Sequence, residues 1–278
     1  MSERVLLAGC GDLGLRVARR LLACGDQVYA LRRRPSTDDA TGIQWLQGDL
    51  TDAASLRGLP SSNITQLVYL PTPDRRDEAA YRSTFVDGLK HVSNALDGAA
   101  LKRVVFVSSS AVYGDHHGAL IDESTLAQPY GFNGKVLLEA EQWLAAQAIP
   151  AITLRLAGLY GPGRLQLFER LRNGQARVPR NESHWANRIH TEDAAQAIVH
   201  LLQLIDPLPL YLGVDDTPLP LDVLYDTLAQ MIGADPPQNG PAPSGIGSKR
   251  LSNRRLRDSG FVPTWTDSRI GYAALLES

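Results

Sequence analysis

The sequence has too few cysteines for a metal centre or a disulfide framework. Only two of its 278 residues are cysteine, Cys10 and Cys24, and their positions do not match the ligand spacing of a zinc site. We therefore expect both to be reduced, buried thiols, and we predict no bound metal.

Long apolar runs and an excess of one charge are also missing. No stretch reaches the roughly 18 apolar residues of a membrane span, and the start lacks the apolar core and cleavage site of a secretory signal. The formal net charge is −2, and the run Arg32–Arg34 is too short to form the basic face that nucleic-acid binding needs. We expect a cytoplasmic protein that binds a small molecule, and neither nucleic acid nor a membrane.

The remaining composition is that of an ordinary globular protein. Hydrophobic residues make up 44% of the chain and charged residues 21%, which excludes disordered, collagen-like and coiled-coil classes. The length suits a nucleotide-binding core with a smaller second lobe.

Short apolar runs alternate with amphipathic segments along the chain. The runs that we expect as buried parallel strands are Val5–Ala8, Gln27–Leu31, Gln66–Leu70, Arg103–Ser108 and Ala151–Leu156. The segments that we expect as helices are Leu13–Ala23, Glu78–Leu96, Lys135–Ala148, Glu192–Leu204 and Leu221–Ile232. This alternation predicts an α/β fold with a doubly wound parallel sheet of the Rossmann type.

The pattern weakens after about Gly158, where a loop containing glycine and proline follows. We predict a dinucleotide-binding core over residues 1–158. Residues 159–278 would mainly form a small substrate-binding lobe, with residues 187–212 returning to the core. Such a lobe would lie at the carboxyl ends of the strands, where doubly wound folds bind their ligands.

A glycine-rich turn follows the first expected strand and leads directly into a helix. Its glycines allow a tight turn, close approach of the backbone to a diphosphate and close packing of helix on strand, while the helix N-terminus offers free N–H groups to the anion. The residues that we predict to bind the diphosphate are Gly9, Gly11, Asp12, Leu13 and Gly14.

Arginines stand where a site for NAD would carry an acid. That acid, about 20 residues after the glycines, holds the ribose 2′-hydroxyl, whereas this chain has Arg32 and Arg33 at the end of its second expected strand. A guanidinium matches a 2′-phosphate in charge and geometry, so NADP(H) is favoured over NAD(H). The alternative is a solvated basic turn. Further on, Asp49 is a candidate for the adenine amino group, with Leu50 beside it.

Three later segments carry recognisable motifs: FVSSSAVYGD at 106–115, LRLAGLYGPG at 154–163 and NRIHTED at 187–193. Together they resemble the extended short-chain dehydrogenase/reductase superfamily, which includes nucleotide-sugar epimerases and dehydratases. The resemblance covers nearly the whole chain. It implies that Ser109 holds the substrate oxygen and that Arg164 and Arg188 contact the nucleotide part of a substrate. We expect Tyr113 to be a packed aromatic with its hydroxyl at the rim of the site.

The same resemblance implies a catalytic tyrosine four residues before a lysine on one helix. Lys135 matches the lysine, but Gly131 stands four residues before it and Tyr130 stands five before it. At about 100° per residue, a fifth position is rotated by about 140° from the lysine, against about 40° for a fourth. Pro129 suggests that Tyr130 lies at or before the helix start, from where the phenol could still reach the site.

Two functions therefore remain open. The first is an NADP(H)-dependent oxidoreductase or epimerase/dehydratase that acts on a nucleotide-sugar-like or other carbonyl or hydroxyl compound, with Ser109, Tyr130 and Lys135 as catalytic residues. The second is a non-enzymatic NADP(H)-binding sensor, which would not need the tyrosine at its usual position. Gly134-Lys135 resembles the Gly followed by Arg or Lys of an atypical subfamily that lacks the usual tyrosine–lysine pair. We expect a monomer or a homodimer.

Overall fold

Parallel strands separated by helices form the first half of the chain, as the sequence predicts. The computed structural model describes residues 2–35, 42–243 and 245–277. The chain divides into two compact units. Unit 1 comprises Met1–Ser109, Lys135–Arg155 and Ala195–Leu210, and unit 2 comprises Ser110–Gly134, Leu156–Ala194 and Tyr211–Ser278.

A seven-stranded sheet with the order β12-β7-β5-β4-β1-β2-β3 carries the fold. The strands are β1 (Arg4–Ala8), β2 (Gln27–Arg32), β3 (Gln44–Gln47), β4 (Gln66–Tyr69), β5 (Arg103–Ser109), β7 (Ala151–Leu156) and β12 (Leu210–Gly213). The pairs β1–β2, β1–β4, β2–β3 and β4–β5 are all parallel. The predicted α/β fold with a doubly wound parallel sheet is therefore confirmed.

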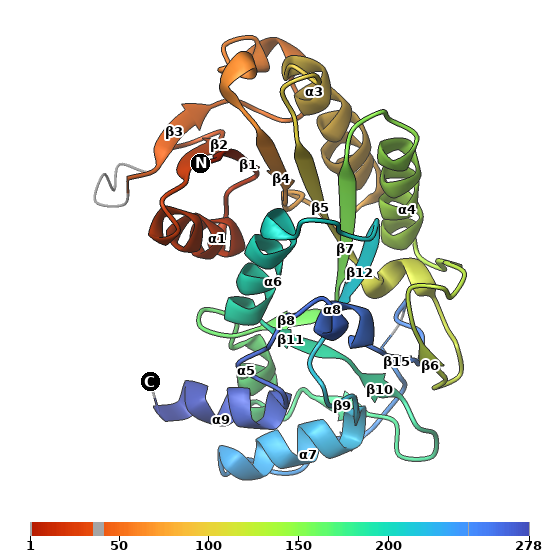
Figure 1. Cartoon of the computed structure of the whole chain (residues 1–278). Coiled ribbons are helices and arrows are strands. Elements are labelled where there is room, and N and C mark those ends of the chain that lie inside the picture. Colours follow the sequence, from red (N-terminus) through yellow and green to blue (C-terminus); the bar gives the residue numbers. More distant parts are fainter. Residues whose placement is uncertain (1, 36–41, 244, 278) are drawn as a thin grey trace. The chain divides into compact units, whose positions relative to one another are not determined.

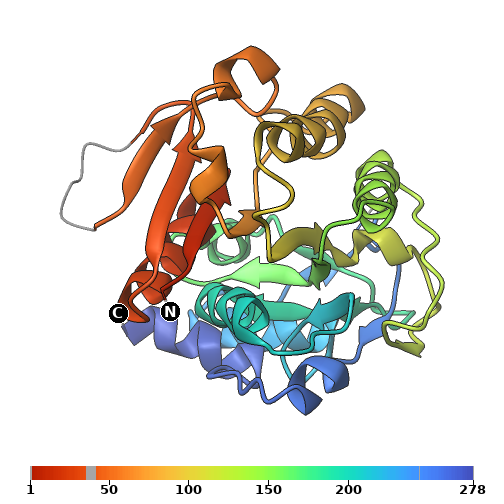
Figure 2. The same ribbon diagram turned by 45° about the horizontal axis from the view of Figure 1, so that its top comes forward.

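Helices cover both faces of this sheet in unit 1 (Figures 1 and 2). Helices α3 (Gly88–Ala95) and α4 (Phe132–Ala145) lie over one face, and α1 (Asp12–Ala23) with the main part of α6 (Thr191–Gln203) lies over the other. A strand that is covered on both faces has no side exposed to solvent, and residues 5–8 of β1 are accordingly all buried.

The first helix is amphipathic and ends at Cys24, whose N–H bonds to carbonyls of the last turn. Its buried side includes Leu13, Val17 and Leu21, which pack toward the sheet. Cys10 is buried and Cys24 is exposed. The expectation of two buried thiols is wrong for Cys24, because this residue caps the helix end where the chain turns at Gly25.

The helix expected over Glu78–Leu96 is interrupted. It consists of α2 (Glu78–Tyr81), a π-helical segment (Arg82–Asp87) and α3. The hydroxyl of Tyr69 donates a 2.5 Å hydrogen bond to the carbonyl of Thr84, inside the π-helical segment. A Cβ on Gly88 would lie 2.6 Å from the same hydroxyl. The wider turn thus makes room for a buried phenol from the sheet.

A buried ion pair joins the sheet of unit 1 to α4. The guanidinium of Arg155 on β7 donates to the Glu141 carboxylate on α4 at 2.6–3.1 Å. The hydroxyl of Ser108 on β5 donates to the same carboxylate at 2.5 Å. All three residues are buried. The carboxylate of Glu141 therefore ties β5, β7 and α4 together.

Unit 2 is built from short elements around its own core. Its helices are α5 (Gln166–Arg172), α7 (Leu221–Met231), α8 (Arg254–Asp258) and α9 (Ser268–Glu277). Its short strands are β6 (Leu120–Ile121), β8 (Gly158–Tyr160), β9 (Arg177–Val178), β10 (Trp185–Ala186), β11 (Arg188–His190), β13 (Leu219–Pro220), β14 (Gln238–Asn239) and β15 (Arg250–Leu251).

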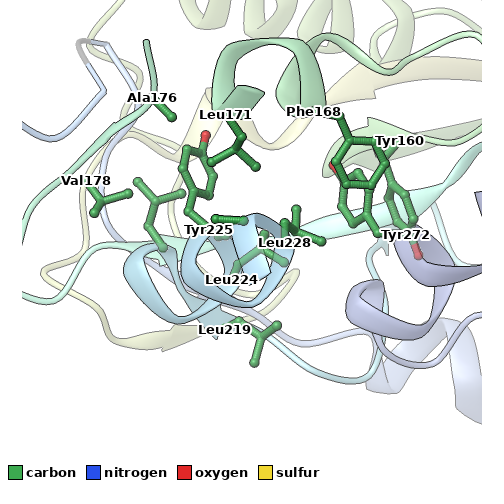
Figure 3. Packing of buried hydrophobic residues seen from close by; sticks show 13 residues of the cluster. Tyr160, Phe168, Leu171, Ala176, Val178, Leu219, Leu224, Tyr225, Leu228 and Tyr272 are labelled. Atoms are coloured by element: carbon green, nitrogen blue, oxygen red, sulfur yellow. The ribbon is translucent and has the colours of Figure 1, made fainter. Parts of the chain in front are cut away.

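The core of unit 2 combines aromatic rings with the apolar side of α7 (Figure 3). Tyr160 stacks on Tyr272 with 4.4 Å between ring centroids, and Phe168 meets Tyr272 edge-on. Leu224 and Leu228 of α7 belong to the same cluster. In the described part of the chain, no helix has both the length and the apolar character to cross a membrane.

The buried ion pair predicts a large loss of stability on truncation. Glu141→Ala leaves the Arg155 guanidinium buried without a counter-charge, so we expect the free energy of unfolding to fall by about 3–5 kcal/mol. The measurement is the denaturant midpoint in urea, with the slope checked for constancy.

Two residues away on the same helix, Glu139 provides the control. Its carboxylate pairs with Arg82 at 2.7 Å, but both side chains are nearly half exposed, and pairs of this kind add little to stability. We expect Glu139→Ala to leave the midpoint almost unchanged. Equal losses for the two variants would contradict the assignment.

Candidate functional site

The glycine-rich turn lies between β1 and α1, where the sequence predicts it. Gly9 has a φ of +88°, which favours glycine. A Cβ at this position would also lie 2.5 Å from the Cα of Pro71, which follows β4. Gly9 is therefore required both by its own backbone conformation and by the close approach of a neighbouring segment.

Gly11 and Gly14 serve two different purposes. Gly11 precedes α1, no side-chain cap bonds to the helix start, and a Cβ on Gly11 would meet nothing within 4 Å. A Cβ on Gly14 would lie 3.0 Å from the Cys10 sulfur, so Gly14 permits close packing of helix on strand. Open space beside a glycine at a helix start suits the close approach of a diphosphate. Asp12 and Leu13 lie in the first turn of the same helix.

A pocket of about 250 Å³ opens in front of this turn, entirely within unit 1. Six of the predicted cofactor-binding residues line it: Gly9, Gly11, Arg32, Arg33, Asp49 and Leu50. The structure therefore brings together the ends of β1 and β2 and the loop after β3. Lys135 is not among the lining residues.

The two arginines of the pocket have different partners. The Arg33 guanidinium forms a bidentate ion pair with Asp74, with 2.5 and 2.6 Å between nitrogen and oxygen atoms. Arg32 lies with its guanidinium 5.8 Å from the centre of the Trp45 ring. Asp49 accepts hydrogen bonds from the N–H and hydroxyl of Thr51 on a single oxygen, Oδ1.

The predicted catalytic residues of unit 1 lie on two neighbouring elements. Ser109 is the last residue of β5, and Lys135 is an exposed residue in the first turn of α4. Because Ser108 bonds to Glu141 on α4, the strand end that carries Ser109 is tied to the helix that carries Lys135.

Tyr130 lies before the start of α4, which begins at Phe132, and belongs to unit 2. Tyr130 is 57% exposed, and the Asp115 carboxylate lies near its hydroxyl. Partial desolvation and this carboxylate raise the pKa of the Tyr130 phenol. Both residues line a second pocket, of about 420 Å³, together with His184.

Close packing explains why a glycine, Gly134, precedes Lys135 at the start of α4. A Cβ on Gly134 would lie 2.5 Å from the carbonyl oxygen of Ala111 and 2.8 Å from the Cβ of Pro129. The first turn of the helix thus passes close to the loop after β5, and only glycine fits there.

Comparison with known proteins identifies the family. The model of the NAD-dependent epimerase/dehydratase family matches residues 5–210. The chain belongs to this family. The protein YeeZ of Escherichia coli K12 is 29% identical over 96% of this chain and 98% of its own length. The family assignment confirms the resemblance found in the sequence.

Solved structures of this family share the fold. A Methylobacillus flagellatus structure, provisionally named as an NAD-dependent epimerase/dehydratase, is 37% identical, covers 100% of this chain and 98% of its own, and has a TM-score of 0.84. MoeE5, solved with UDP-glucose and NAD, is 22% identical with a TM-score of 0.81 over 99% of this chain and 98% of its own. At that identity the second match shows the fold alone.

Of the residues that the sequence analysis assigns to the substrate, Ser109 ends the first segment of unit 1, and the other three lie in unit 2. Tyr113 is fully buried, as expected of a packed aromatic, and its hydroxyl donates to the carbonyl of Asp122 at 3.2 Å. Arg188 lies on β11 against Gly158, where a Cβ would be 2.6 Å from Nη1. Arg164 follows the loop after β8. Neither arginine lines one of the two pockets described above.

The sequence analysis did not identify three acidic residues that form ion pairs or lie buried in the structure. Asp74 pairs with Arg33, Glu141 pairs with Arg155, and Asp215 is buried in unit 2. Asp74 and Glu141 have no local signal, because their partners lie 41 and 14 residues away in the sequence. Among the described residues, no group of three or more His, Cys, Asp or Glu is placed to hold a metal ion.

Asp215 follows β12 and is only 2% exposed. Its N–H donates to the carbonyl of Arg188 at 2.7 Å, and its Oδ1 accepts from the N–H of Thr217 at 3.3 Å. In the described part of the chain its buried Oδ2 has no hydrogen-bond partner. Burial, together with the charge of Asp267, raises the pKa of this carboxyl to about 8.

This raised pKa predicts a dependence of stability on pH. Between about pH 4 and pH 8 the unfolded chain has lost the Asp215 proton while the folded chain retains it, so the free energy of unfolding falls as pH rises. Asp215→Asn, which resembles the protonated acid, removes this loss. We expect the free energy of unfolding of the variant, relative to that of the original protein, to increase by up to about 1.4 kcal/mol per pH unit across that range.

The measurement is urea unfolding of both proteins at pH 5, 6, 7 and 8. Titrations of other groups cancel in the difference between the two proteins. A difference that stays constant over these pH values would show that Asp215 does not carry a raised pKa.

Proposed function

We propose that this protein is an NADP(H)-dependent oxidoreductase or epimerase/dehydratase acting on a nucleotide-sugar-like or other carbonyl or hydroxyl compound. The observation that carries the proposal is the open space in front of Gly11 at the start of α1, in the same pocket as two arginines. Membership of the NAD-dependent epimerase/dehydratase family supports it.

In this proposal the turn at Gly9–Gly14 holds the diphosphate of the dinucleotide on the N–H groups of α1. Arg32 and Arg33 face the 2′-phosphate, while Asp49 accepts from the adenine amino group next to Leu50. Because Oδ1 of Asp49 is committed to Thr51, the adenine would bond to Oδ2. When bound, the nicotinamide ring accepts or gives a hydride.

Ser109, Lys135 and Tyr130 would carry the chemistry. The hydroxyl of Ser109 donates a hydrogen bond to the reacting oxygen, and Lys135 binds the nicotinamide ribose. Tyr130 transfers the proton that accompanies the hydride. The link from Ser108 to Glu141 supports a fixed spacing between Ser109 and Lys135. A nucleotide-sugar substrate is supported by MoeE5, whose structure holds UDP-glucose.

One observation favours the second candidate, a non-enzymatic sensor of NADP(H). The Asp115 carboxylate lies near the hydroxyl of Tyr130 and raises the pKa of the phenol. A proton-transfer tyrosine needs its pKa lowered toward the working pH. The sensor predicts that the dinucleotide binds without turnover.

Gly11→Ala tests the dinucleotide site directly. Gly11 has a φ of −87°, which alanine adopts without strain, so the variant should fold normally. The new methyl group would occupy the space of the diphosphate, and we expect the dissociation constant for NADPH to rise at least tenfold. Isothermal titration calorimetry gives this constant without an activity assay.

Gly98→Ala is the matched control. Gly98 also lies in unit 1, and a Cβ there would meet nothing within 4 Å, but it does not line the pocket. We expect its affinity for NADPH to equal that of the original protein. Equal binding by the Gly11 variant would refute the proposed cofactor site.

The catalytic assignment is tested by comparing Tyr130→Phe with Lys135→Ala. If the protein is an enzyme of the proposed kind, loss of the proton-transfer hydroxyl should lower kcat by about 10²- to 10⁴-fold with NADPH affinity unchanged. Lys135→Ala should weaken NADPH binding as well. Turnover is followed by NADPH absorbance against a panel of nucleotide sugars and simple carbonyl compounds. Full activity in Tyr130→Phe would exclude this tyrosine as the acid or base.

A further inference from the structure

The pair formed by Arg33 and Asp74 lies on the wall of the dinucleotide pocket. Arg33 follows β2 and Asp74 follows β4, and both residues line the pocket. Both terminal nitrogens of the guanidinium face the carboxylate, Nη1 at 2.5 Å and Nη2 at 2.6 Å. The bond pattern is the parallel, two-pronged one that arginine also uses for phosphate.

Carboxylate and phosphate therefore compete for one face of the guanidinium. The paired Nη atoms of Arg33 match either anion, and they are bonded to Asp74 in this structure. Hydrogen bonding to the partner raises the pKa of Arg33 and lowers that of Asp74, so both groups are charged at neutral pH. Asp74 also places a negative charge beside any phosphate that approaches.

The pair is exposed, with 56% of the Arg33 side chain and 64% of the Asp74 side chain accessible. Water and salt screen exposed pairs, and such pairs hold their partners weakly. A bound anion can therefore displace the carboxylate without disturbing the fold. The buried pair of Glu141 and Arg155 in the same unit has no such freedom.

Among the described residues, no acid is paired with the guanidinium of Arg32. This guanidinium lies over the ring of Trp45 at 5.8 Å, and an aromatic face leaves the N–H groups at the edge of the guanidinium plane directed outward. Within the described part of the pocket, Arg33 is therefore the arginine whose availability depends on a neighbouring acid.

We propose that Asp74 sets the cofactor selectivity of this pocket by holding Arg33 in an ion pair that a 2′-phosphate has to displace. Asp74 thereby weakens binding of the 2′-phosphorylated cofactor, while a cofactor with a free 2′-hydroxyl leaves the pair intact. This inference rests on the proposed dinucleotide site and adds a selectivity residue to it.

Asp74→Asn tests the inference, because it keeps the shape of the side chain and removes its charge. The probes are adenosine 2′,5′-bisphosphate and 5′-AMP, which differ only in the 2′-phosphate, followed by NADPH and NADH. We expect the variant to bind the bisphosphate and NADPH about twofold to fivefold more tightly, the upper part of the range of an exposed ion pair. Binding of 5′-AMP and NADH should change by less than twofold. The gain should shrink as salt is added.

Asp77→Asn is the matched control. Asp77 lies three residues further on, pairs with Arg75 at 3.2 Å and accepts the N–H of Ala80 at the start of α2, a role that asparagine also fills. It does not line the pocket. We expect unchanged affinity for all four nucleotides, and the same thermal midpoint for both variants as for the original protein.

The same substitution in an Arg33→Ala background completes a double-mutant cycle. Without Arg33 there is no guanidinium to release, so the gain for the 2′-phosphorylated probes should be lost. The inference is overturned if Asp74→Asn changes both probes equally, changes neither, or keeps its full effect without Arg33. If the original protein binds none of the nucleotides, the proposed function fails as well, and this outcome is distinct from binding of both probes with no effect at Asp74.

Discussion

The close approach of two backbone segments at Gly9 is the constraint on which the candidate site depends. β1 pairs with β2 on one side and β4 on the other, and the N–H of Gly9 reaches back to the carbonyl of Leu31 while its Cα faces Pro71. The turn is therefore flanked by the ends of both neighbouring strands. Arg33 and Asp74 reach one pocket because each follows one of those strands.

Two ion pairs in unit 1 illustrate how burial separates structural from exchangeable charge. Glu141 and Arg155 are enclosed and share their bonds with Ser108, so neither can leave without stranding the other. Arg33 and Asp74 have comparable distances but stand in water at the pocket wall. The buried carboxylate–guanidinium pair thus fixes α4 against the sheet, whereas the exposed pair provides a counter-ion that another anion can replace.

The sheet and its glycine turn could be predicted because their signals are local. Buried strands appear as apolar runs, and the three glycines stand at fixed spacing between β1 and α1. The π-helical segment could not be predicted, since it depends on the hydroxyl of Tyr69, fifteen residues before Thr84. The partner of Arg33 lies 41 residues along the chain, and only the order of the strands brings it close.

Tyr130 marks the limit of what residue spacing can decide. Its offset from Lys135 was evident in the sequence, but a rotation of 100° per residue applies only inside a helix, and α4 begins two residues later at Phe132. What matters for a phenol is the group that its hydroxyl meets. A lysine ammonium lowers the pKa of a phenol, whereas the Asp115 carboxylate raises it. Proton transfer by Tyr130 therefore requires a cation in place of Asp115 beside its hydroxyl.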